Sequence, residues 1–157
     1  MAESSIQCVL LTSFDAEFSF LRSVLRFAGI RVNRAESLEE ADFLLMVTGA
    51  TVLLSDVAMA GCSWRCAMER VRDFHPLVAM LLIADPVDEP FIQDAFTLGA
   101  CGVLWKPIPF DGAAKLIRVA HEASRERAIL REEGQCARAG AGGGVTLSMV
   151  GGGGGRR

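Results

Sequence analysis

The sequence lacks a long hydrophobic run, and its first residues contain no basic segment followed by an apolar one. A helix that crosses a bilayer requires about 20 apolar residues in succession. A secretory signal requires a basic segment followed by an apolar one. We therefore expect a cytoplasmic protein that does not have a membrane as its partner.

An excess of positive charge and a disulfide pattern are also missing. The 16 basic and 19 acidic residues give a net charge of -3, so charge offers no reason to expect nucleic acid as a partner. Five cysteines, an odd number without an export signal, fit reduced thiols better than a disulfide framework. The length of 157 residues, of which 51% are hydrophobic, predicts one globular domain.

Short segments rich in leucine or β-branched residues alternate with helical patterns along most of the chain. This alternation predicts a parallel sheet with helices on both faces. The predicted strands are residues 6–11, 31–35, 51–55, 78–83 and 102–105. Five helices are predicted to begin near Phe14, Ser37, Ser63, Asp88 and Asp111.

Two helices carry clear local signals. In the first, apolar residues recur at spacings of three and four between Phe14 and Ala28, which indicates one buried face. In the second, Ser37 and Glu40 have the spacing of a capping box, in which each side chain accepts from the other's backbone amide.

The composition changes near the C-terminus. Residues 124–133 are rich in charge of both signs, and ten of the 16 glycines lie from Gly134 onward. Such a glycine-rich segment buries too little apolar surface to offset the entropy of ordering it. We therefore expect a domain over residues 1–125, an extension of the last helix over 126–133, and a disordered tail over 134–157.

The predicted strand ends place several polar residues at one edge of the sheet, where doubly wound sheets form their sites. Thr12 and Ser13 follow the first strand, Asp56 follows the third, and Lys106 follows the fifth. A lysine close to an aspartate keeps the carboxylate ionised and can neutralise a phosphoryl group attached to it.

These segments resemble the response-regulator receiver family of two-component signalling, over roughly residues 6–125. The matching pieces are Leu53-Leu54-Ser55-Asp56 with Met59 three residues on, Gly99-Ala100, and Lys106-Pro107. The resemblance implies a flavodoxin-like, doubly wound sheet of five parallel strands in the order 2-1-3-4-5, with five helices. It also implies a cis bond between Lys106 and Pro107, which prolines permit at modest cost.

By the same resemblance, Asp56 is the phosphoacceptor for a sensor histidine kinase, and Lys106 contacts the phosphoryl oxygens. The domain is then a phosphorelay module and not an enzyme. Thr12 and Ser13, however, stand where receivers carry the acidic pair that binds magnesium. Magnesium prefers carboxylates, so Asp56 with two hydroxyls is expected to hold it weakly, and phosphoryl transfer depends on that ion.

The resemblance also marks Ala84 and Val103 as altered switch positions. Receivers usually have a serine or threonine at the first position and an aromatic residue at the second. Ala84 has no hydroxyl to bond a phosphoryl group, and Val103 has no aromatic ring to move with it. The usual coupled movement is therefore not expected.

Three functions remain open from the sequence. The first is an atypical receiver that acts as a protein-interaction module, offering the face of the fourth helix, fifth strand and fifth helix to a signalling protein or a second copy. The second is a phosphorylation-competent receiver that accepts a phosphoryl group on Asp56. The third is an unrelated flavodoxin-like ligand binder or enzyme, for which no nucleophile with a base and no glycine fingerprint is evident.

Overall fold

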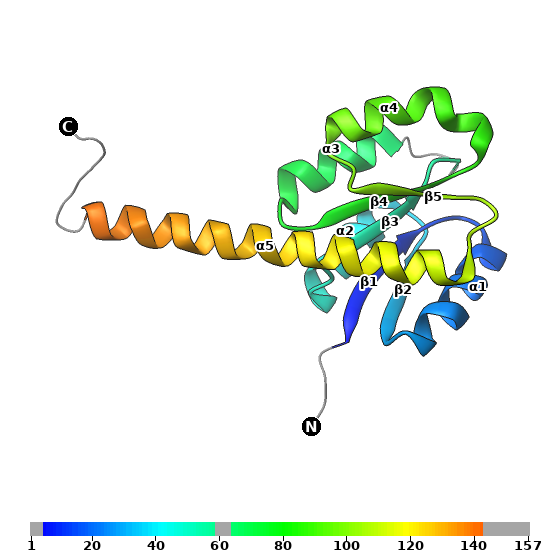
Figure 1. Cartoon of the computed structure of the whole chain (residues 1–157), viewed down its shortest axis with the longest axis horizontal. Coiled ribbons are helices and arrows are strands. Elements are labelled where there is room, and N and C mark those ends of the chain that lie inside the picture. The colour runs from blue at the N-terminus through cyan, green and yellow to red at the C-terminus, as the bar shows by residue number, and fades with distance from the viewer. Residues whose placement is uncertain (1–4, 59–63, 143–157) are drawn as a thin grey trace. The chain divides into compact units, whose positions relative to one another are not determined.

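The computed structural model describes residues 5–58 and 64–142 and contains one five-stranded sheet (Figure 1). All neighbouring strands are parallel, and their order is β2-β1-β3-β4-β5, which confirms the predicted doubly wound topology. The strands are β1 (Ile6–Leu11), β2 (Ile30–Ala35), β3 (Val52–Asp56), β4 (Ala79–Ala84) and β5 (Gly102–Trp105).

The α-helices follow the strands in alternation, as the sequence predicted. They are α1 (Asp15–Phe27), α2 (Leu38–Thr48), α3 (Trp64–Phe74), α4 (Glu89–Leu98) and α5 (Phe110–Gly142), with a short 3-10 helix (Pro86–Asp88) before α4. Within the described ranges, no helix has both the length and the apolar composition needed to cross a membrane.

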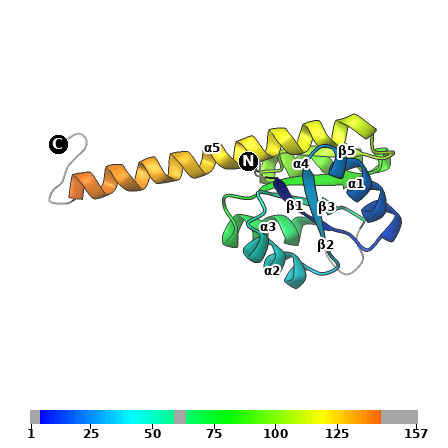
Figure 2. The same cartoon turned by 90° about the horizontal axis from the view of Figure 1, so that it is seen from below.

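The sheet lies between two helical layers (Figures 1 and 2). On one face, alternate strand residues such as Leu53 and Leu82 pack against α2, α3 and α4. On the other face, Leu54 and Leu81 pack against α1 and the first part of α5. Because β3 and β4 are covered on both sides, their sequences are apolar almost throughout, with side chains alternating between the layers.

The buried stripe of α1 is close to the one predicted. Leu21, Val24 and Leu25 are its buried residues. Phe14 occupies the N-cap position just before the helix, makes no side-chain capping bond and is exposed. Asp15 is the first residue of the helix, and its carboxylate pairs with the Arg34 guanidinium of β2. The aspartate is largely exposed, so this pair adds little to stability.

The predicted cap of α2 is present in part. The Glu40 N–H donates to Ser37 Oγ at 3.2 Å, as expected. The Glu40 carboxylate, however, accepts from the backbone N–H of Glu36 at 2.6 Å and not from that of Ser37. The Glu40 side chain therefore satisfies the amide of Glu36, one residue before the predicted partner. At the other end of α2, Gly49 terminates the helix with a φ of 68°.

Ser37→Ala is expected to lower the free energy of unfolding by about 1 kcal/mol, because the Glu40 amide loses its side-chain acceptor. Urea unfolding followed by circular dichroism measures the change. Ser23→Ala, at an exposed position within α1, is the matched control and should change stability by only a few tenths of a kcal/mol. Equal effects of the two substitutions would contradict a capping role for Ser37.

The end of α5 differs from the prediction. The sequence placed the end of the helix at Glu133, but α5 continues to Gly142. Residues 134–142 include glutamine, arginine and several alanines, which are strong helix formers and outweigh the interspersed glycines. The compact unit that contains the sheet ends at Ser124, and residues 143–157 of the predicted tail lie outside the described residues.

Candidate functional site

The carboxyl ends of strands β1, β3 and β5 bring three of the predicted site residues to one edge of the sheet. Thr12 directly follows β1, Asp56 is the last residue of β3, and Lys106 directly follows β5. Lys106 is fixed there by its backbone, since its N–H donates to the carbonyl oxygen of Ala84 at 2.8 Å. The pairing of the strands therefore places the backbone of these three residues at the same edge of the sheet.

Asp56 and Lys106 form a close ion pair. The Lys106 Nζ lies 2.9 Å from Asp56 Oδ2, and the aspartate side chain is 0% exposed. The other carboxylate oxygen, Oδ1, accepts from the backbone N–H of Ala58 at 2.8 Å. Oδ1 thus accepts a hydrogen bond, whereas Oδ2 has the charge of Lys106 beside it but no hydrogen-bond partner of good geometry among the described residues. The convergence of one aspartate with one lysine is as the sequence predicted.

A third charged residue, Glu17, completes the cluster and was not predicted. Its Oε2 lies 3.2 Å from the same Lys106 Nζ, and its side chain is only 9% exposed. Glu17 stands in the first turn of α1, and the sequence did not predict it as a site residue. The position of Glu17 in the sequence could have indicated its role, because it is a carboxylate only three residues after the loop that follows the first strand.

Burial and the neighbouring aspartate change the acidity of Glu17. Burial, followed by the hydrogen bond and negative charge of Asp56, raises the pKa of Glu17 from 4.5 to about 7. The Thr12 hydroxyl and the positive charge of Lys106 act in the opposite direction but are weaker. One oxygen of Glu17, Oε1, is buried without a hydrogen-bond partner among the described residues, which also favours a proton there.

Lys106 stays firmly protonated in this setting. Burial lowers its pKa, but its hydrogen bond to Asp56 and the charges of Glu17 and Asp56 outweigh that effect and raise the pKa. The Nζ also lies 5.1 Å from the centre of the Phe14 ring. The cluster therefore combines one ammonium with two carboxyl groups that hold either one or two negative charges near neutral pH.

Thr12 and Ser13 occupy different surroundings. Thr12 is fully buried, and its Oγ1 accepts from the backbone N–H of Phe14 at 3.1 Å. Ser13 is exposed. Only the first of the two positions therefore contributes a hydroxyl beneath the cluster, where it interacts with Glu17.

Solved structures share this fold, although no protein-family model and no curated protein matches the sequence. A receiver domain protein from Clostridium thermocellum is 17% identical, with a TM-score of 0.70 over 79% of this chain and 98% of that one. A response regulator from Thermotoga maritima is 18% identical, with a TM-score of 0.68 over 76% and 99%. A structure titled adenylate cyclase, from Rhodopirellula baltica, is 18% identical, with a TM-score of 0.76 over 84% and 98%.

The chain has the response-regulator receiver fold. The cis bond that the resemblance implied between Lys106 and Pro107 is present. At 9% to 18% identity the likeness shows the fold, and the chemistry has to be argued from the site itself.

The two residues that the resemblance marked as altered switch positions, Ala84 and Val103, are apolar and packed against neighbouring side chains. Ala84 is fully buried at the end of β4. Val103 is half-buried and packs in the layer of α2, α3 and α4. Neither side chain can donate a hydrogen bond to a group placed on Asp56.

Magnesium is the cofactor that the receiver fold implies, and the residues present suit it poorly. They offer two carboxylates and the Thr12 hydroxyl, but the Lys106 ammonium already lies against both carboxylates. Within residues 5–58 and 64–142, no group of three acidic, histidine or cysteine side chains could hold a metal ion. Because magnesium requires near-ideal oxygen coordination, this set does not fit a tightly bound ion.

Proposed function

We propose that this chain is a receiver-fold signalling domain that acts mainly through protein contacts, with phosphorylation of Asp56 weakened or absent. The observation that carries the proposal is the buried cluster of Glu17, Asp56 and Lys106. In it the ammonium of Lys106 is already paired with two carboxyl groups, at 3.2 and 2.9 Å.

The cluster opposes phosphorylation in two ways. A phosphoryl group on Asp56 adds negative charge beside Glu17, and like charges repel strongly where the surroundings exclude water. The same group needs Lys106, which it would have to share with Glu17. Ala84 offers no hydroxyl as a further donor.

The face of α4, β5 and α5 is the surface that we propose for the partner, a sensor histidine kinase or another signalling protein, or a second copy of the chain. Phe96 of α4, Trp105 of β5 and Val119 of α5 are large apolar residues exposed on these three elements. Trp105 and Val119 also line an open groove of about 370 Å³ between β5 and α5. Exposed apolar side chains on adjacent elements are typical of surfaces that bind proteins.

The alternative is a phosphorylation-competent receiver. It is favoured by the retained Asp56–Lys106 pair and by Glu17, which returns one acidic group to an edge that lacks the usual pair. In this version Asp56 accepts the phosphoryl group and Lys106 neutralises it, while Glu17 takes a proton or moves aside.

Amide chemical shifts during a titration with magnesium and beryllofluoride distinguish the two, because beryllofluoride on a carboxylate imitates a phosphoryl group. We expect no saturable change in the amide shifts of Ala58, Lys106 or α4 when the wild-type protein is titrated. The Asp56→Asn variant should likewise show no response to the titration. Saturable shifts at these positions that disappear in Asp56→Asn would establish the working switch instead. Partner binding that depends on phosphorylated Asp56 would likewise contradict the interaction module.

A further inference from the structure

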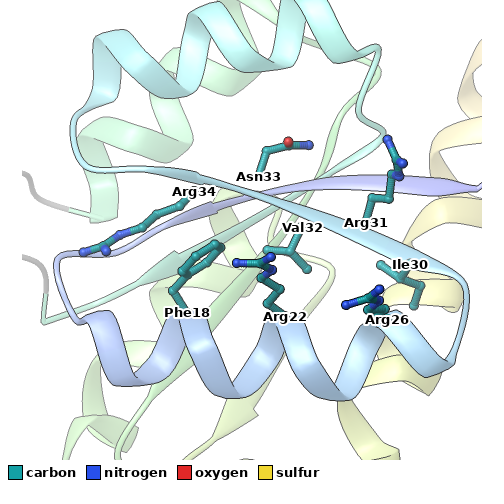
Figure 3. A pocket seen from close by; sticks show the side chains of 8 residues that line it. All are labelled: Phe18, Arg22, Arg26, Ile30, Arg31, Val32, Asn33 and Arg34. Atoms are coloured by element: carbon teal, nitrogen blue, oxygen red, sulfur yellow. The ribbon is translucent and has the colours of Figure 1, made fainter.

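An arginine-rich groove lies between α1 and the outer edge of β2, away from the Asp56 cluster (Figure 3). We propose that this groove binds a small soluble molecule that carries two or more phosphate groups. The inference rests on the geometry and charge of the groove and is independent of the function proposed above.

The groove follows from the periodicity of its two walls. Phe18, Arg22 and Arg26 are spaced four residues apart on α1, so they form one stripe along the helix. Figure 3 shows this stripe facing β2, from which Val32 and Arg34 project on the same side. β2 is one of the two edge strands of the sheet, so the groove is open to solvent along that edge.

The charge of the groove is of one sign. Four arginines and no carboxylate line it, in a chain whose net charge is -3. Among the described residues, no acidic side chain pairs with Arg22, Arg26 or Arg31. Only Arg34 has a counterion, Asp15, and it also donates to the Thr12 carbonyl oxygen at 3.3 Å. The other guanidinium groups are thus available to an anion.

The Phe18 ring lies close to two of these arginines. The guanidinium carbons of Arg22 and Arg34 lie 5.9 and 5.8 Å from the centre of its ring, one from each wall of the groove. The ring thus brings together one guanidinium from each wall, and the planar set of donors on each guanidinium matches two oxygens of a phosphate. Ile30 and Val32 supply an apolar base beneath them.

The size of the groove indicates the class of ligand. Its volume is about 500 Å³, which is within the range of small-molecule sites and fits a compound of the size of a nucleotide. Arginines are spread along the groove from Arg26 to Arg34, so one phosphate cannot contact them all. Arg31 projects from the opposite face of β2 and stands at the rim (Figure 3). A compound with several linked phosphate groups could contact arginines at both ends of the groove.

The test is calorimetric titration of the full chain with inorganic triphosphate. We expect saturable binding of one triphosphate per chain, and a loss of affinity of about tenfold or more in Arg22→Gln/Arg26→Gln, which removes two charge-assisted contacts. The matched control, Arg72→Gln/Lys115→Gln, removes the same charge from exposed sites on α3 and α5 and should change the affinity by less than about twofold. No saturable binding, or an equal loss in the control, would overturn the proposal.

Two further titrations separate other anions of similar charge. A hexaglutamate peptide could add to the open edge of β2, and vesicles that contain phosphorylated phosphatidylinositol present the same phosphates on a membrane. We expect both to bind more weakly than triphosphate. If the peptide binds more tightly, with the same dependence on Arg22 and Arg26, the groove is a peptide site. If only the vesicles bind, the soluble ligand is excluded. Unchanged melting temperatures of the variants establish that they are folded.

Discussion

Lys106→Met is expected to lower the free energy of unfolding by about 3 to 5 kcal/mol, because it leaves two carboxyl groups in a buried site without a cation. The Lys106 side chain is only 24% exposed and Asp56 is 0% exposed, so water can replace little of the lost attraction. Urea unfolding at pH 7 measures the change. Lys115→Met, on the exposed side of α5, should have an effect within about 0.5 kcal/mol.

A second variant separates charge from packing. Adding Asp56→Asn and Glu17→Gln to Lys106→Met removes the unpaired negative charges while keeping the side chains close to their original size. Most of the lost stability should return, since apolar or neutral replacements of a buried ion pair are often tolerated. A triple variant as unstable as Lys106→Met alone would show that the lysine acts through packing and not through its charge.

Glu17→Gln is expected to abolish much of the dependence of stability on pH between 5 and 8. The folded protein raises the pKa of Glu17 from 4.5 to about 7, mainly by burial and then by Asp56. Protonated Glu17 is therefore the form that the fold prefers. Its contribution to stability is complete below about pH 4.5 and is lost as the pH rises through about 7, a difference of at most about 3 kcal/mol.

Glutamine cannot ionise, so the Glu17→Gln variant should equal or exceed the wild-type protein in stability at pH 8 and lose this advantage at pH 5. Unfolding curves at several pH values measure the difference between the two proteins. His75 and His121 are present in both, so the difference isolates Glu17 from them. Glu39→Gln, an exposed change in the first turn of α2, is the control. Parallel curves for the wild-type protein and Glu17→Gln would contradict a neutral Glu17.

The two predictions concern one feature, the sharing of Lys106 by two carboxyl groups. At pH values below 7, protonated Glu17 leaves Asp56 as the main charge on the lysine. Above 7, both carboxylates compete for it. The net charge of the cluster of Glu17, Asp56 and Lys106 therefore changes near neutral pH, because Glu17 gains or loses a proton there.

The sequence predicted the strands and helices well because the burial of each element determines the pattern of apolar residues in its sequence. Strands β3 and β4 are covered on both faces, so their residues are apolar almost without interruption. Helix α1 has one buried face, so Leu21 and Leu25 recur with helical spacing. The predicted strand ends differ from the observed ones by at most one residue, and the order of the strands is as expected. The end of α5 was placed wrongly, because glycines were weighed above the helix formers between them.

The sequence could not show which acidic residue of α1 reaches the site. Asp15 and Glu17 are two residues apart, so about 200° of rotation around the helix separates their side chains. The packing of Leu21 and Leu25 against the sheet fixes that rotation, and it turns Asp15 toward Arg34 and Glu17 toward Lys106. The arginine-rich groove has the same origin, since Arg22 and Arg34 meet only where α1 lies along β2.

By itself, then, the sequence determined the alternation of strands and helices, the sheet order through its resemblance, and the meeting of Asp56 with Lys106 at the strand ends. Those features depend on local periodicity and on the rule that parallel strands end at one edge. The tertiary structure alone decided that Glu17 shares the lysine and that four arginines surround one groove. The rotation of a helix about its axis is set by packing against distant residues, and no local pattern in the sequence records it.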